Sequence, residues 1–159
     1  PQHGPDREPG KEQLVAFGYI SCPDVCPTTL LEMKEVLKLL GDRAVQLQPI
    51  FITVDPGRDS AQVLREYTSA FDPRILGLRG SEALTRRAAG EHKVRYEKVR
   101  DPAAPPESYT VDHSAGMILL GPDGRTAVRF AYATPARQVA ERIGALMLEE
   151  NQRVPTQRR

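Results

Sequence analysis

Strand-like and helix-like sequence patterns alternate along most of this 159-residue chain. Short apolar runs rich in β-forming residues recur between longer segments whose apolar residues lie three or four positions apart. The expected strands cover residues 14–20, 48–54, 75–78 and 94–99, and the expected helices between them cover 27–40, 60–71 and 82–89. Two more strands, 117–120 and 127–131, flank the turn sequence Gly121-Pro122-Asp123-Gly124, and a last helix opens at Thr134-Pro135. This order predicts a three-layer α/β sandwich with a mixed central sheet.

The order of the elements also resembles one known arrangement. An early βαβ unit followed by a late ββα unit is typical of the thioredoxin fold, in which the loop after a strand carries reactive cysteines at a helix N-terminus. Local signals predict where the elements end. Thr29 has capping-box spacing near the start of the first helix, and Gly41 is expected to end that helix. Gly90 is expected to close the third helix, and Asp59 or Ser60 to cap the second.

Composition and charge exclude several classes of protein. Residues 13–150 carry the alternating pattern and are expected to form one domain, between a flexible arm at 1–12 and a basic tail at 151–159. The formal net charge of +1 argues against nucleic acid as a main partner. No apolar run is long enough to span a membrane, and the chain begins at Pro1, as a processed or trimmed form would. Any membrane tether is therefore expected outside this sequence.

Both cysteines lie in one short segment between the first expected strand and the first expected helix. Cys22 and Cys26 are separated by three residues, whereas thioredoxin-type oxidoreductases use two. The partial positive charge of a helix N-terminus favours the thiolate form there. Two thiolates are soft ligands that suit Cu(I) or zinc, and the acidic residue Asp24 lies between them. The pair is consistent with a metal site, a redox couple or a single disulfide.

A metal site with two sulfur ligands commonly takes an imidazole as its third donor, and the chain has three histidines. His3 lies in the arm and His92 at the end of the third helix, where surface positions are expected. His113 lies between a Pro-rich loop at 101–110 and an apolar strand, and such a segment can reach the sheet end that carries the cysteines. Asp112 beside it can orient the imidazole, as outer-shell carboxylates do. The candidate metal ligands are therefore Cys22, Cys26 and His113.

Three blocks of the sequence resemble the Sco/SenC family of proteins. They are FGYISCPDVCPTTL at 17–30, FITVDPGRD at 51–59, and VDHS at 111–114 followed by GPDG at 121–124. The resemblance runs in order from about residue 14 to residue 147. It implies a thioredoxin-like fold and one copper ion, Cu(I) or Cu(II), held by two cysteines and a histidine, which here are Cys22, Cys26 and His113. Family members usually carry an additional N-terminal hairpin, which the residues before Leu14 do not show.

The resemblance also implies a cellular role. Sco/SenC proteins are assembly factors for cytochrome c oxidase, which help to load the binuclear copper centre of its copper-bearing subunit and can keep the cysteines of that subunit reduced. They work outside the cytoplasmic membrane in bacteria or in the mitochondrial intermembrane space, and most are tethered to the membrane. For this chain the expectation is a protein tethered at the periplasmic face of the bacterial inner membrane. Its expected partners are that copper-bearing subunit and other copper chaperones.

Three other functions share parts of this pattern. A thiol–disulfide oxidoreductase would use Cys22 and Cys26 without a metal, and His113 is the residue that it would not require. A peroxiredoxin-like peroxidase is suggested by Cys26-Pro27-Thr28-Thr29, but Pro23 stands where that family places the threonine that orients peroxide. A copper or redox sensor needs the same ligands as a delivery protein, so the sequence does not separate these two.

Overall fold

The computed structural model describes residues 10–21, 25–106, 108–113 and 116–153, apart from the side chains of Val25, Cys26, Thr110, Asp112 and His113. The strands are β1 (Glu12–Gly18), β2 (Leu47–Thr53), β3 (Leu76–Leu78), β4 (Tyr96–Arg100), β5 (Tyr109–His113), β6 (Met117–Leu120) and β7 (Thr126–Phe130). The helices are α1 (Val25–Leu40), the 3-10 helix η1 (Gly41–Gln46), α2 (Ala61–Phe71), α3 (Glu82–Glu91) and α4 (Ala136–Arg153). Every strand and helix expected from the sequence is present, and β5 is an additional strand.

The main sheet has β1 at its centre. Its five strands lie in the order β3-β2-β1-β6-β7. β1 pairs with β2 in parallel and β2 with β3 in parallel, whereas β6 is antiparallel to both β1 and β7. All seven residues of β1 are buried because helices or loops cover both faces of the strand, which explains its continuous apolar run. The mixed sheet predicted from the sequence is therefore confirmed.

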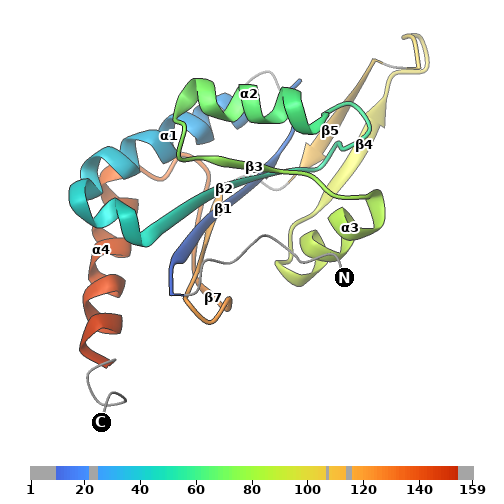
Figure 1. Cartoon of the computed structure of the whole chain (residues 1–159). Coiled ribbons are helices and arrows are strands. Elements are labelled where there is room, and N and C mark those ends of the chain that lie inside the picture. The colour runs from blue at the N-terminus through green and yellow to red at the C-terminus, as the bar shows by residue number, and fades with distance from the viewer. Residues whose placement is uncertain (1–9, 22–24, 107, 114–115, 154–159) are drawn as a thin grey trace.

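Helices cover both faces of this sheet. Figure 1 shows α1 and α2 above the sheet and α3 below it, with α4 packed beside α1. The two parallel connections place α1 and α2 on the same face because both crossovers run in the same direction along the sheet. Residues buried between the layers include Leu14, Leu30, Leu37, Phe51, Leu64, Leu119 and Ile143. No helix among the described residues is both long and apolar enough to cross a membrane.

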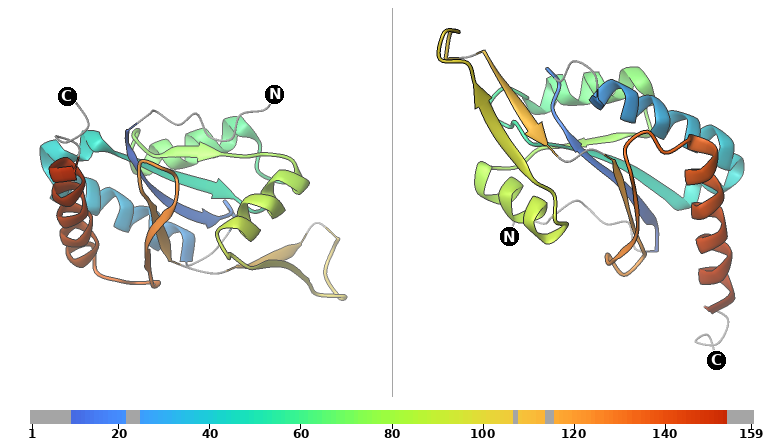
Figure 2. Two further views of the ribbon diagram at one scale, coloured as in Figure 1. Left: turned by 90° about the horizontal axis from the view of Figure 1, so that it is seen from below. Right: turned by 180° about the vertical axis from the view of Figure 1, so that it is seen from behind.

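The β4–β5 hairpin forms a second, two-stranded sheet. It projects from the main sheet beside the carboxyl end of β1, and this arrangement is seen in all three views of Figures 1 and 2. Its register pairs Arg100 with Tyr109 at the loop end and Tyr96 with His113 at the base. The sequence predicts loop as far as residue 110, so the prediction is wrong at Tyr109, where β5 begins. The prolines at 102, 105 and 106 fill only the connection between the two strands.

Several predicted element ends can be compared with the structure. Gly41 has φ +58° directly after α1, as expected for a residue that ends a helix. Ser60 caps α2, because its Oγ accepts a hydrogen bond of 3.2 Å from the Val63 N–H. Two predictions are wrong: Thr29 is buried inside α1, and Gly90 lies inside α3. Helix α1 starts earlier than its apolar spacing indicates, and α3 continues because a glycine with ordinary helical backbone weakens a helix without ending it.

Candidate metal centre

The candidate cysteines lie between β1 and α1. Cys26 is the second residue of α1, so its backbone is in the first helical turn, as the sequence predicts. Cys22 and Asp24 are outside the described residues. Tyr19, directly after β1, is buried with 3% of its surface exposed, whereas Ser21 is exposed. The described chain therefore leaves the core by Ser21, after the carboxyl end of β1, and regular structure is described again from Val25 at the start of α1.

The backbone of His113 lies at the same end of the sheet. His113 is the last residue of β5 and pairs with Tyr96 of β4. Strand β6 runs antiparallel to β1, with Ile118 opposite Val15. The chain that leads into β6 therefore lies at the carboxyl end of β1, and His113 is four residues before Met117, where β6 starts. The fold thus brings the end of β5 and the start of α1 to one edge of the molecule.

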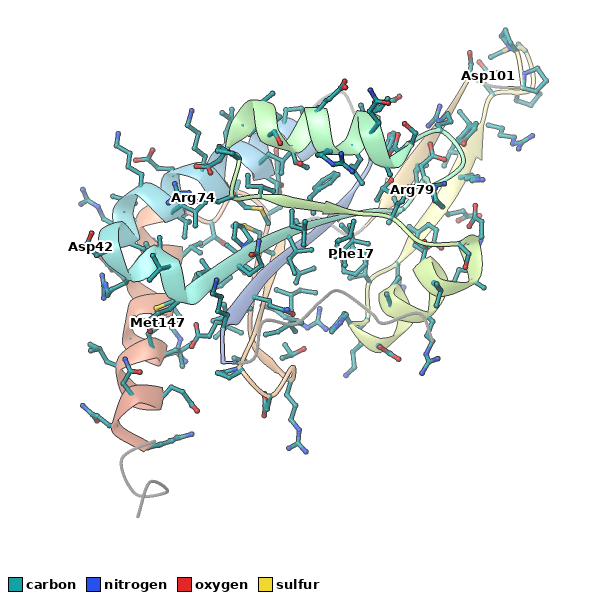
Figure 3. All side chains as sticks on the ribbon, in the orientation of Figure 1. Phe17, Asp42, Arg74, Arg79, Asp101 and Met147 are labelled. Carbon is teal, nitrogen blue, oxygen red and sulfur yellow. The ribbon has the colours of Figure 1, made fainter. Side chains whose placement is uncertain are left out.

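The convergence of the three candidate ligands themselves stays a prediction. The side chains of Asp112 and His113 are not among those described, although the Asp112 backbone pairs with Glu97. Within the described residues, no group of three His, Cys, Asp or Glu side chains could hold a metal ion. His92 directly follows α3, as predicted, but it is half-buried and not on the open surface: its ring is 6.4 Å from that of Phe17, which Figure 3 labels on β1.

A polar cluster surrounds the loop that follows β2, and we call it the aspartate cluster. Its members are Thr53 at the end of β2, Asp55, Arg58 and Asp59 in the loop, and Tyr109 at the start of β5. Asp55 and Asp59 are 0% and 2% exposed. The Thr53 hydroxyl donates a hydrogen bond of 2.6 Å to Asp59 Oδ2 and accepts one of 3.0 Å from the Asp55 N–H. The Asp59 N–H donates to the Asp55 carbonyl at 3.0 Å. These bonds satisfy oxygen atoms that would otherwise be costly to bury.

Two members of the aspartate cluster, Arg58 and Tyr109, connect the loop after β2 to the β4–β5 hairpin. The Tyr109 hydroxyl donates a hydrogen bond of 2.7 Å to Asp55 Oδ1, and Arg58 Nε donates to Asp55 Oδ2. The guanidinium carbon of Arg58 lies 3.7 Å from the centre of the Tyr109 ring, which is a close cation–π contact. Arg79, labelled in Figure 3 beside the hairpin, donates a hydrogen bond of 2.7 Å to the Pro56 carbonyl. The loop after β2 is thus held from several sides.

Burial changes the acidity of two members of the cluster. It raises the pKa of Asp59, and the hydrogen bonds from the Thr53 hydroxyl and the Ile20 N–H act in the opposite direction because they stabilise the carboxylate. Burial also raises the pKa of Tyr109, and the hydrogen bond to Asp55 adds to this effect because it stabilises the neutral phenol. Tyr109 therefore remains a hydrogen-bond donor to Asp55 well into the alkaline range.

Sequence patterns alone do not indicate this cluster. Sequence analysis predicts either Asp59 or Ser60 as the cap of the second helix, and Ser60 is the residue that caps α2. Asp59 instead binds Thr53 and the Ile20 N–H. One signal was available: two acidic residues flank an arginine directly after a buried parallel strand, where side chains from neighbouring strands meet. No sequence pattern indicates that Tyr109 is the partner of Asp55, because 54 positions separate the two residues.

Comparison with known proteins establishes the family. The SCO1/SenC family model matches residues 4–148, which is most of the chain. The chain belongs to the SCO1/SenC family. An SCO2-like protein of Rickettsia felis is 35% identical to it over 136 residues, which cover 86% of this chain and 66% of that protein. This SCO1/SenC chain therefore spans just under two thirds of the length of that relative.

Solved SCO1/SenC structures share the fold. The ScoI protein of Bradyrhizobium japonicum, solved with copper bound, is 38% identical and superposes with a TM-score of 0.76 over 86% of this chain and 85% of that chain. The ScoI protein of Arabidopsis thaliana, also solved with copper bound, is 28% identical with a TM-score of 0.80 over 88% and 86% of the two chains. These similarities confirm the predicted thioredoxin-like α/β sandwich.

Proposed function

We propose that this chain binds one copper ion through Cys22, Cys26 and His113 and delivers it during the assembly of cytochrome c oxidase. The observation that carries the proposal is the similarity, over 86% and 88% of the chain, to two Sco proteins solved with copper bound. Copper is here the cargo of the protein. The backbone positions of Cys26 and His113 at one edge of the fold support the ligand set.

The chemistry of these three residues suits a delivery protein. Two soft thiolates and one imidazole bind Cu(I) well, and imidazole is also a good ligand for Cu(II). Three protein ligands leave an open position, so a thiolate or imidazole of the receiving protein can bind before the first ligand leaves. The start of α1 stabilises the Cys26 thiolate through its partial positive charge. Asp112 and Asp24, which neighbour the ligands in the sequence, would orient His113 and shape the charge around the ion.

The receiving protein that we propose is the copper-bearing subunit of cytochrome c oxidase, and other copper chaperones would supply the ion. Membership in the SCO1/SenC family supports this role. A formal net charge of +1 suits docking onto one protein surface better than binding along a polyanion. The setting that we propose is the periplasmic face of the bacterial inner membrane, held there by a tether outside this chain, and the Rickettsia relative supports a bacterial setting.

Copper titration of single variants tests the ligand set. We expect Cys22→Ala, Cys26→Ala and His113→Ala each to weaken copper binding by more than the roughly 10- to 100-fold that is typical when an outer-shell residue is lost. The binding is measured for Cu(I) by competition with a chromophoric chelator and for Cu(II) by the thiolate absorption. His92→Asn is the matched control, because His92 follows α3 and is not one of the proposed ligands, and it should bind one copper ion as the parent does. A His113→Ala variant with the copper affinity of the parent would refute the three-ligand site.

Thiol–disulfide exchange is the second candidate function, and the thioredoxin-like fold with Cys26 in the first turn of α1 favours it. The same two thiols would then pass electrons to a partner disulfide, and the chain would end with its own Cys22–Cys26 disulfide. An exchange assay on the copper-free protein separates the functions. A redox role alone predicts that His113→Ala keeps full exchange activity and that Cys22→Ala and Cys26→Ala lose it.

A further inference from the structure

The aspartate cluster touches both segments that carry the candidate ligands. On the cysteine side, the Ile20 N–H donates a hydrogen bond of 3.1 Å to Asp59 Oδ2, and Ile20 is two residues before Cys22. The neighbouring Val54 N–H donates to the Gly18 carbonyl at 2.8 Å, which extends the pairing of β1 with β2. The direction in which the chain leaves β1 is therefore fixed by the loop after β2.

On the histidine side, the contact is Tyr109. This residue opens β5, and His113 closes the same strand four residues later. The Tyr109 hydroxyl reaches Asp55 at 2.7 Å, and its ring is covered by Arg58 at 3.7 Å. The hairpin is not part of the main sheet. These contacts therefore attach the strand that carries His113 directly to the loop after β2.

The two sides are joined through the backbone of that loop. Asp55 and Asp59 are linked by a backbone hydrogen bond of 3.0 Å, and Thr53 binds both of them through its hydroxyl. Apolar side chains of similar volume commonly stabilise a core as well as buried charges do, so stability is a weak explanation for two buried aspartates. A hydrogen-bonded network that fixes direction as well as distance is a better explanation for their position between two ligand-bearing segments.

We propose that Asp55 and Asp59 are positioning residues, which hold the Cys22 loop and the His113 strand at a set separation through Ile20 and Tyr109. The inference rests on the proposed copper site. Ligands that are already in place bind a metal ion more tightly than ligands that must first be ordered. Loosening either contact is therefore expected to weaken copper binding without removing a ligand.

The test is Tyr109→Phe, which keeps the ring under Arg58 and removes only the hydroxyl that binds Asp55. Tyr132→Phe is the matched control, because Tyr132 is 43% exposed after β7. We expect Tyr109→Phe to bind copper about tenfold more weakly than the parent, within the range for outer-shell changes, and to shift the Cu(II)–thiolate absorption. A merely structural role would alter the melting temperature and leave affinity and absorption as in the parent, and that result would overturn the proposal.

Hydrogen exchange on the copper-free protein checks the link itself. In Tyr109→Phe, the Ile20 amide should exchange faster than in the parent, although Ile20 lies on the opposite side of the cluster from the substitution. Unchanged exchange at Ile20 would show that the two segments are not linked and would also overturn the proposal.

If Tyr109→Phe fails to fold, Arg58→Lys loosens the same contact, with Arg65→Lys on the exposed side of α2 as its control. A parent that binds no copper refutes the proposed function, whereas a parent that binds and a variant that binds equally refutes only the positioning role.

Discussion

Gly116 lies where the chain enters β6, beside the backbone that follows β7. Its φ is +108°, a conformation that residues with a side chain rarely adopt. A Cβ atom at this position would lie 2.3 Å from the Phe130 carbonyl oxygen and 3.3 Å from the Tyr132 nitrogen. Both neighbours are backbone atoms, which cannot rotate away as the end of a side chain can. The close approach of the two segments therefore requires a glycine here.

The expected cost of a side chain at this position can be measured. We expect Gly116→Ala to lower the free energy of unfolding by at least about 2 kcal/mol, because it adds both a backbone clash and an unfavourable φ. Gly90→Ala in α3 is the control, since nothing lies within 4 Å of its added Cβ. The control should stabilise the protein by about 0.5–1 kcal/mol. Denaturant titration of the two variants decides, and equal stabilities would contradict the argument.

At this scale the sequence predicts residues whose role is local. Ser60 as a helix cap and Gly41 as a helix end depend on neighbours within four positions, and the structure confirms both. Cys26 at the start of a helix was predicted for the same reason. The role of Asp59 as a hydrogen-bond acceptor is not predicted, because its bond to the Ile20 N–H joins residues 39 positions apart. Hydrogen bonds of that range become visible only when the strand order is known.

The start of β1 and the end of α4 interact at the scale of elements. Glu12, the first residue of β1, is 6% exposed, and its Oε2 has no hydrogen-bond partner among the described residues. Burial, and secondarily the charge of Glu150 near the end of α4, raise the pKa of Glu12 from 4.5 to about 7. The folded protein therefore keeps a proton on Glu12 at pH values where the unfolded chain has lost it.

This difference predicts how stability changes with pH. Between about pH 4.5 and pH 7 the folded state binds more protons than the unfolded state, so the contribution of Glu12 to stability is complete below pH 4.5 and is lost as the pH rises through 7. The loss amounts to at most about 3 kcal/mol. Glu12→Gln should remove this slope, whereas Glu35→Gln on the exposed side of α1 should keep it. Urea unfolding at several pH values measures the effect, and a slope that persists in Glu12→Gln would refute its origin.

Elements with a strong pattern were predicted well, and weakly patterned ones were not. Strands β1 and β2 lie in the middle of the sheet, so their apolar runs are long and their positions were found within two residues. The sequence pattern does not predict strand β5 at all, because prolines precede it closely and its partner is an exposed strand. For the candidate site, the sequence predicts the residue types of the ligands and their spacing along the chain. How its segments are held together depends on the hairpin, whose separate pairing the sequence pattern did not indicate.

At the scale of the whole molecule, the main sheet and the β4–β5 hairpin differ in how well they are covered. Strand β1 is buried along its full length, whereas the last four residues of β4 are exposed. A lone two-stranded hairpin has little stability of its own in water. Its attachment through Tyr109 and Arg58 is therefore expected to determine how often it opens.

This difference should appear in amide hydrogen exchange of the parent protein measured at increasing denaturant. We expect the amides of β1 and β2 to exchange only through global unfolding, and those of β4 to exchange through a smaller opening with a lower free energy. The distinction does not depend on copper. Equal opening free energies in β1 and β4 would mean that the hairpin and the sheet unfold as one unit.

The pairing of β1 with β6 also determines when the candidate site can form. Leu14 pairs with Leu119, so the centre of the sheet joins residues about 100 positions apart. Closing so long a loop costs chain entropy before the contacts are gained, and folds rich in such contacts form slowly. Cys22 and Cys26 are close in the sequence, whereas the segment that carries His113 reaches the carboxyl end of β1 only when β6 pairs with that strand. If the three residues form the copper site proposed above, the two thiols of a newly made chain lack their third ligand during folding, and in that interval they are open to oxidation.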